Sequence, residues 1–263
     1  MLGKIMRYCV KRVANYRVKV DSVKAEVNKI LSNNTSQLNK IGFLNETDKA
    51  SLLIDSHSDT NDIRIAHDYL RHYDFFFASF RDDKFNLLEF GCQRGNSLRM
   101  WEKYFTNAEI YGVDIDESTK VNEKDRVHIV IGNAVEKNTH DQIKSISDKF
   151  FIILDDASHA WGDQRLSFEL FWDLVTPGGF YVIEDLECGT LGAFPEYPPK
   201  IQDAQPFYEY IFDRARYLRW APDREPDKNS YHVEQLPENL QKIQREMDMC
   251  VFIPGAVIVR KRV

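Results

Sequence analysis

Apolar residues near the start of the chain are spaced alternately by four and three positions. They are Leu2, Met6, Cys9, Val13, Tyr16, Val20, Val23, Val27 and Ile30. This spacing is the a/d rhythm of a coiled coil, held for about four heptads. We therefore predict a helix within residues 1–35, which ends at the polar run that begins at Ser32.

Three interpretations of this N-terminal helix remain open. A narrow apolar strip with β-branched residues at a and d favours self-association, so a homo-oligomer ranks first. Lysines and arginines flank the strip, which is also typical of a helix on an anionic membrane, so peripheral membrane contact through residues 1–31 ranks second. The third interpretation is a helix that packs on its own domain.

The following segment, residues 36–84, is expected to form a helical cover or lid. Within it, apolar and aromatic residues recur at spacings of three and four from Asn61 to Phe80, which predicts a helix over that range.

From residue 85 to residue 263 the pattern changes to short apolar runs separated by helix-length segments. The runs are NLLEFG (86–91), EIYGVDID (109–116), RVHIVIGNA (126–134), FFIILDD (150–156) and GFYVIED (179–185). This alternation predicts an α/β fold with a doubly wound parallel sheet. The last apolar runs turn at Pro254-Gly255, which predicts a C-terminal antiparallel hairpin beside that sheet.

Acidic residues follow two of the predicted strands. Asp155 and Asp156 end one strand, and Glu184 and Asp185 end the next. Neighbouring parallel strands lie about 4.8 Å apart and deliver their ends to one edge, where open α/β sheets bind ligands. Carboxylates this close repel one another unless a positive charge lies among them, so we expect a hard cation or a cationic substrate there.

A glycine-containing turn follows the first strand of the sheet. Gly91 and Gly95 of this turn let the backbone approach a ligand at the start of a helix. Asp114 ends the next strand, where a carboxylate can hold ribose hydroxyls. Because no phosphate-binding GxxxxGK[ST] motif is present, the pattern favours S-adenosylmethionine. In this interpretation Glu89 and Gly91 line the methionine end, and Asn133 borders the adenine.

Composition limits the classes of function further. The net charge of −6 combines +7 on residues 1–40 with −13 on the remainder, and an acidic body argues against a nucleic-acid partner. No stretch approaches the ~20 consecutive apolar residues of a membrane span, and no signal-peptide core is evident, so we expect a cytoplasmic protein. Four scattered cysteines indicate neither a zinc site nor a disulfide framework.

The motifs together resemble a known enzyme family. The runs LEFGCQRGNSLRMW, IYGVDID, LDDASH and PGGFYVIED are similar to those of sugar O-methyltransferases of the macrocin and mycinamicin type. Rhamnosyl O-methyltransferases and the cephalosporin-modifying protein of cephamycin synthesis are relatives of that family. The resemblance covers about residues 58–190. It implies a class I methyltransferase-like (Rossmann-like) fold that uses S-adenosylmethionine and Mg²⁺.

The resemblance also implies roles for individual residues. The metal would be held by Asp156, Glu184 and Asp185. Asp156 would also take part in catalysis, and His159 would be the general base. Asp155 would contact the cofactor or cap the turn that follows.

The expected function is transfer of a methyl group to a sugar hydroxyl of a glycoside or polysaccharide. Two alternatives remain open. One is the same chemistry on a non-sugar natural product, or a place in a modification complex. The other is a non-catalytic scaffold that binds a nucleoside.

Overall fold

The computed structural model describes residues 36–54, 63–188, 206–215 and 237–263. These residues form two compact units, which divide after Ala78, six residues before the boundary expected from the sequence. The predicted heptad helix lies outside the described residues. Its self-association and its membrane contact therefore stay predictions.

The first unit combines two short helices with a small hairpin. Its elements are α2 (Gln37–Leu44), β1 (Leu52–Ile54), β2 (Ile63–Ile65) and α3 (Leu70–Phe77), and a 3-10 turn, η1 (Ala78–Phe80), follows at the boundary. The prediction of one helix from Asn61 to Phe80 is wrong, because β2 pairs antiparallel with β1 and the helix begins only at Leu70. Two β-branched isoleucines in three residues favour a strand, and the positive φ of 60° at Asp68 interrupts any helix before Leu70.

The second unit is an α/β domain. Its elements are β3 (Asn86–Phe90), α4 (Asn96–Tyr104), β4 (Glu109–Asp114), η2 (Glu117–Asn122), β5 (Val127–Ile131), α5 (Lys137–Ile146), β6 (Phe150–Asp155), α6 (Trp161–Phe171), η3 (Trp172–Leu174), β7 (Val175–Ile183), α7 (Phe207–Ala215), α8 (Glu238–Glu246), β8 (Met247–Ile253) and β9 (Ala256–Lys261).

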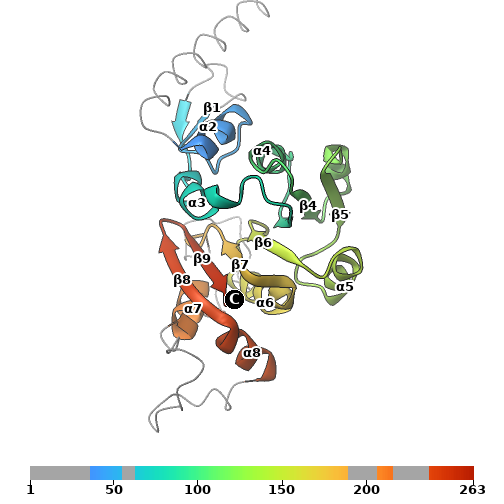
Figure 1. Cartoon of the computed structure of the whole chain (residues 1–263), viewed down its shortest axis with the longest axis vertical. Helices are drawn as coiled ribbons and strands as arrows, with labels where there is room; N and C mark the ends of the chain where they lie inside the picture. Colours follow the sequence, from blue (N-terminus) through green and yellow to red (C-terminus); the bar gives the residue numbers. More distant parts are fainter. Residues whose placement is uncertain (1–35, 55–62, 189–205, 216–236) are drawn as a thin grey trace, which may run out of the picture. The chain divides into compact units, whose positions relative to one another are not determined.

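Seven strands of this unit form one sheet, in the order β5-β4-β3-β6-β7-β9-β8 (Figure 1). Strands β3 to β7 are parallel, and β9 joins β7 and β8 by antiparallel pairing. The strand order reverses direction between β3 and β6, which is the topological switch point where open α/β sheets bind ligands. The doubly wound sheet and the terminal hairpin predicted from the sequence are both confirmed.

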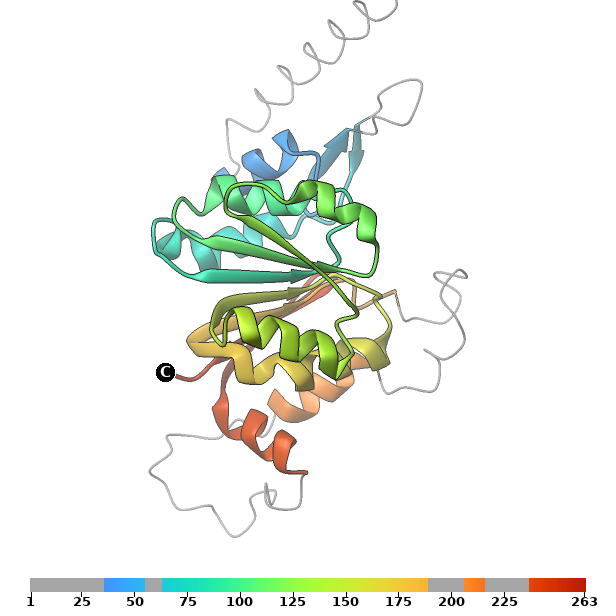
Figure 2. The same ribbon diagram turned by 90° about the vertical axis from the view of Figure 1, so that its right-hand side faces the viewer.

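Helices cover the two faces of the sheet. Leu88 and Phe90 of β3 join a buried apolar cluster that contains residues of α5, α6, α7 and α8. Since side chains alternate along a strand, Glu89 faces the other side, where Trp101 of α4 donates a hydrogen bond to it. Helices α5 and α6 lie side by side (Figure 2). The sheet is therefore buried on both faces, as parallel sheets require.

Helix α8 was not predicted from the sequence, although it carries a readable signal. Pro237 precedes its first residue, and the buried Leu240, Ile243 and Gln244 recur at spacings of three and four. Among the described helices, none is both long and apolar enough to cross a membrane.

Candidate active site

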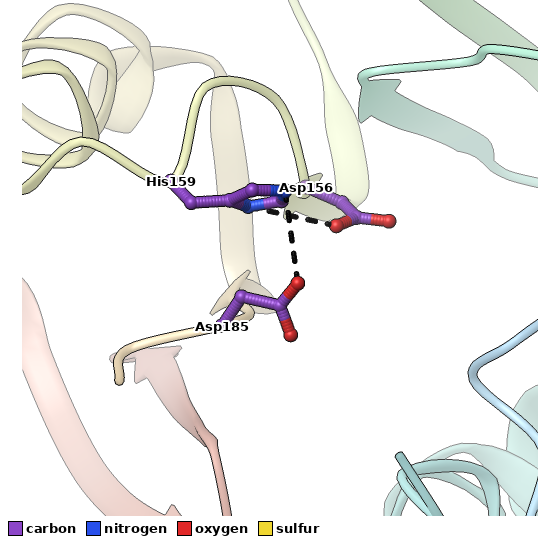
Figure 3. A group of neighbouring side chains, drawn as sticks. All are labelled: Asp156, His159 and Asp185. Carbon is purple, nitrogen blue, oxygen red and sulfur yellow. Dashed lines mark ion pairs between the residues drawn. The ribbon is translucent and has the colours of Figure 1, made fainter. Parts of the chain in front are cut away.

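Three side chains from the loops after two neighbouring strands come together at the carboxyl edge of the sheet. Strands β6 and β7 are parallel neighbours with Asp155 opposite Ile183, so the residues that follow each strand emerge side by side. Asp156 and His159 come from the loop after β6, and Asp185 comes from the loop after β7 (Figure 3). Ligand atoms of these three residues all lie within 4.8 Å of one another.

The imidazole of His159 lies between the two carboxylates. Its Nδ1 is 3.9 Å from Asp156 Oδ1, and its Nε2 is 3.6 Å from Asp185 Oδ2 (Figure 3). These separations are ion-pair distances, longer than hydrogen bonds. The side chains are 21% exposed for Asp156, 12% for His159 and 11% for Asp185, so the group is sheltered but reachable from solvent.

This group fits a divalent cation. Carboxylate oxygens are the ligands that hard cations prefer, and a cation among them would remove their mutual repulsion. The imidazole can either complete a ligand set or accept a proton from a neighbouring group. When bound, such an ion would act as a Lewis acid that polarises a substrate oxygen.

Two members of the group have left-handed backbone conformations. His159 has a φ of 56° and Asp185 a φ of 54°. A non-glycine residue is uncommon in this region and stays there only where its surroundings determine its conformation. Such strain clusters at functional sites. The positions of these two side chains are therefore set by the fold around them.

The glycine turn after β3 packs directly against the loop that carries Asp156. Gly91 has a φ of 84°, and a Cβ placed on it would lie 2.0 Å from the carbonyl oxygen of Asp156. The backbone N–H of Asp156 donates to Phe90 O at 3.1 Å. Glycine at position 91 therefore allows the predicted cofactor turn and the acidic group to share one edge of the sheet.

Asp114 holds the glycine turn from the neighbouring strand. Its Oδ2 accepts hydrogen bonds from the backbone N–H groups of Cys92 and Gln93, each at 2.9 Å. Its Oδ1 accepts from the N–H of Asp116, also at 2.9 Å. The carboxylate therefore lies against the glycine turn, and its contact with ribose hydroxyls stays a prediction.

Glu89 lies beneath this turn. It is fully buried, and Trp101 Nε1 donates to its Oε2 at 3.0 Å. Burial raises the pKa of the nearby Cys92 thiol well above its ordinary value, and the carboxylates of Glu89, Asp114 and Asp156 raise it further. The thiol is therefore protonated and is not a nucleophile at neutral pH.

The other predicted cofactor residues also border this edge. Gly95 has a φ of 70° and precedes α4, where a Cβ would meet the side chain of Asn122 at 2.5 Å. The backbone N–H of Gly132 donates to Asp114 O at 2.9 Å, which holds the end of β5 against β4. Asn133 follows directly, and its Oδ1 accepts from the N–H of Val135 at 3.2 Å. Asn133 therefore follows β5 at the same sheet edge as Asp114, and its place beside the adenine stays a prediction.

Two of the four acidic residues at the ends of β6 and β7 lie outside the group of three. Asp155 is buried, and its Oδ2 accepts a hydrogen bond from Ser167 of α6. Burial raises its pKa to about 7, although hydrogen bonds from Ser167 and Ala157 lower it. The carboxyl group therefore joins β6 to α6, and its contact with the cofactor stays a prediction. Glu184 is buried but is not part of the group, so its assignment as a metal ligand stays a prediction.

Sequence reasoning missed two residues of α6 that contact the loop of Asp185. Trp161 Nε1 donates to Leu186 O, and Gln164 Nε2 donates to Glu184 O. The signal was weak, because an apolar tryptophan and a glutamine spaced by three on a helix are typical of any packed helix.

Comparison with known proteins returns sugar O-methyltransferases. The chain is 35% identical over 127 residues to mycinamicin VI 2''-O-methyltransferase of Micromonospora griseorubida, which is 46% of this chain and 32% of that protein. It is 34% identical over 162 residues to 8-demethyl-8-(2-methoxy-alpha-L-rhamnosyl)-tetracenomycin-C 3'-O-methyltransferase of Streptomyces olivaceus, which is 57% of this chain and 41% of that protein. The resemblance expected from the sequence is confirmed over these residues. No protein-family model matches the chain.

Solved structures show the same fold. The MycE methyltransferase of the mycinamycin biosynthetic pathway, in complex with Mg and SAH, matches with a TM-score of 0.64 at 23% identity, over 87% of this chain and 55% of that one. The chain has the class I methyltransferase fold. The MycE complex with Mg, SAH and mycinamycin VI matches with a TM-score of 0.63 at 22% identity, over 86% of this chain and 55% of that one.

The chain spans between 32% and 41% of the length of the curated relatives that it matches. The similarity in sequence therefore concerns one part of each relative.

Proposed function

We propose that the chain is an O-methyltransferase that moves a methyl group from S-adenosylmethionine to a sugar hydroxyl, with Mg²⁺ at the acidic group. The observation that carries this proposal is the contact between the glycine turn and the acidic loop. Gly91 lies so close to the carbonyl of Asp156 that a methyl donor held by the turn would lie beside the cation site. Methyl donor and acceptor hydroxyl would then meet at one edge of the sheet.

The named activities of the relatives support this proposal. Those at 30–35% identity are named as O-methyltransferases acting on sugars of macrolide and tetracenomycin compounds. The MycE structures hold Mg and SAH, and one also holds mycinamycin VI. We propose an acceptor of the same class, a small molecule that carries a deoxysugar.

Each residue of the group has a proposed role. Asp156 and Asp185 hold the cation, with Glu184 as the predicted third carboxylate. A neutral sugar hydroxyl is a poor nucleophile, and His159, placed between the carboxylates, accepts its proton. The glycine turn and Asp114 hold the donor, so that proximity and orientation supply much of the acceleration.

The proposal is tested by methyl transfer to a panel of deoxysugar glycosides, with release of S-adenosylhomocysteine as the readout. We expect His159→Ala to lower turnover by about 100-fold or more, which is the usual contribution of a general base, and to leave S-adenosylhomocysteine binding unchanged. His128→Ala is the matched control, since His128 lies on β5 and pairs with Glu109 at 2.8 Å, away from the acidic group.

Wild-type turnover in His159→Ala would remove His159 from the role of base. Absence of transfer to every sugar, together with transfer to an aglycone, would replace the sugar acceptor by a non-sugar natural product.

A further inference from the structure

Two side chains in the first turn of α6 donate hydrogen bonds to the backbone on both sides of Asp185. Trp161 Nε1 donates to Leu186 O at 3.0 Å, and Gln164 Nε2 donates to Glu184 O at 2.9 Å. Both bonds are buried. We call this pair of residues the α6 clamp. Neither residue belongs to the group of possible ligands, so any effect of the clamp on that group acts through the backbone.

Two backbone hydrogen bonds also hold the residues next to Asp185. The backbone N–H of Glu184 donates to Asp155 O at 3.0 Å, and the N–H of Leu186 donates to Gly255 O at 2.9 Å. The backbone N–H and the backbone C=O of both Glu184 and Leu186 are therefore hydrogen-bonded. The α6 clamp supplies the two side-chain bonds in this set.

These bonds surround a strained residue. The φ of 54° at Asp185 is unfavourable for a residue with a Cβ, and such a conformation persists only where neighbouring contacts determine it. Without the clamp, the carbonyl groups on both sides of Asp185 would lose their buried donors. The backbone could then relax toward an ordinary φ, which would turn the carboxylate away from His159.

The α6 clamp also connects the two loops that make the site. Helix α6 begins at Trp161, only two residues after His159. Gln164 N donates to Ala160 O at 2.8 Å, which makes the start of the helix continuous with the loop of His159. A displacement of that loop would therefore move the clamp, and with it the backbone of Asp185.

We propose that Trp161 and Gln164 are positioning residues for the cation site, which fix the separation between His159 and Asp185. This inference rests on the proposed function, because it takes Mg²⁺ as the ion that Asp156 and Asp185 hold. Partners that orient metal ligands influence affinity strongly, and their loss weakens binding by about 10- to 100-fold.

The test is a calorimetric titration of the full chain with Mg²⁺ alone. Trp161→Phe removes the N–H donor and keeps an aromatic ring beside Tyr208, whose ring centroid lies 6.2 Å from that of Trp161. Gln164→Met removes the other donor at nearly constant volume. We expect each variant to bind Mg²⁺ about tenfold more weakly than the wild type or worse.

Trp172→Phe is the matched control. Trp172 follows the same helix at its other end, and its Nε1 donates to Glu246 Oε2 at 2.9 Å, so it also loses one indole hydrogen bond. We expect this variant to have a lower melting temperature but wild-type affinity for Mg²⁺.

The possible failures are distinguishable. If the wild type does not bind Mg²⁺, the cation in the proposed function is wrong. If the wild type binds Mg²⁺ and both clamp variants bind it with wild-type affinity, the positioning role is overturned. Equal weakening in Trp172→Phe would also overturn it, since general destabilisation would then account for the loss. Should Trp161→Phe not fold, Gln164→Met alone decides between these outcomes.

Discussion

At the scale of single residues, Gly91 is the position where the site tolerates least change. It combines a φ of 84° with a neighbouring carbonyl that would lie 2.0 Å from a Cβ. We expect Gly91→Ala to lower the free energy of unfolding by about 3 kcal/mol or more, because the cost of a left-handed alanine adds to a backbone clash. Urea denaturation measures this difference.

Gly178→Ala is the control for that prediction. Gly178 has a similar φ of 78°, but the one atom of the described residues that a Cβ there would meet is Val263 Cγ2, at the ordinary distance of 3.5 Å. Only the conformational cost, about 1–2 kcal/mol, is expected. Equal losses in both variants would show that the clash with the acidic loop is relieved without cost.

The candidate site was only partly predictable at this scale. Adjacent acids at the ends of two parallel strands predict a cluster, and Asp156, His159 and Asp185 do come together. The direction of each side chain is harder to predict, because successive residues of a strand point to opposite faces. Asp155 and Asp156 illustrate this, since the first is buried against α6 and the second joins the group. The donors Trp161 and Gln164 could not be assigned from the sequence, because their partners are backbone carbonyls.

At the scale of elements, polar contacts between α5 and η3 should make the stability of the fold depend on pH. Asp173 of η3 contacts two residues of α5, with His140 Nε2 at 3.0 Å and Lys144 Nζ at 2.9 Å. Burial alone would raise the pKa of Asp173, but hydrogen bonds from Lys144 and His140 outweigh it and lower this pKa. The stabilisation is therefore present above the unfolded-state pKa, near 4, and is lost as the pH falls through the lowered folded-state value.

We expect Asp173→Asn to lower the free energy of unfolding by about 1 kcal/mol at pH 7, after allowance for screening by solvent. The difference from the wild type should shrink as the pH falls below about 4. Denaturation at several pH values measures it. A difference in the free energy of unfolding that stays constant with pH would show that packing, and not charge, accounts for the stabilisation by Asp173.

Regular elements were predictable where the apolar pattern was unambiguous. The five parallel strands and the hairpin at Pro254-Gly255 have short apolar runs with clear boundaries, and they are confirmed. The prediction of a helix over 61–80 was wrong at its start. Aromatic residues at helical spacing extend the helical pattern back into the segment Ile63–Ile65, which forms β2. Helix α8 was missed because its few apolar residues are set among charged ones.

At the scale of the whole molecule, the strand order brings the glycine turn and the acidic loop to one edge of the sheet. The switch point lies between β3 and β6, and these strands lead into the glycine turn and the acidic loop respectively. The topology therefore places the proposed donor site and the proposed cation site on one sheet edge, and we expect occupancy of one to influence the other.

The most direct measurement is calorimetric titration of Mg²⁺ into the chain saturated with S-adenosylhomocysteine, for the wild type and Asp156→Ala. We expect both proteins to bind S-adenosylhomocysteine, because the glycine turn and Asp114 are intact in the variant. Only the wild type should then bind Mg²⁺. Failure of the wild type to bind S-adenosylhomocysteine, or equal binding of Mg²⁺ by Asp156→Ala, would contradict a cation-assisted methyltransferase site at this edge of the sheet.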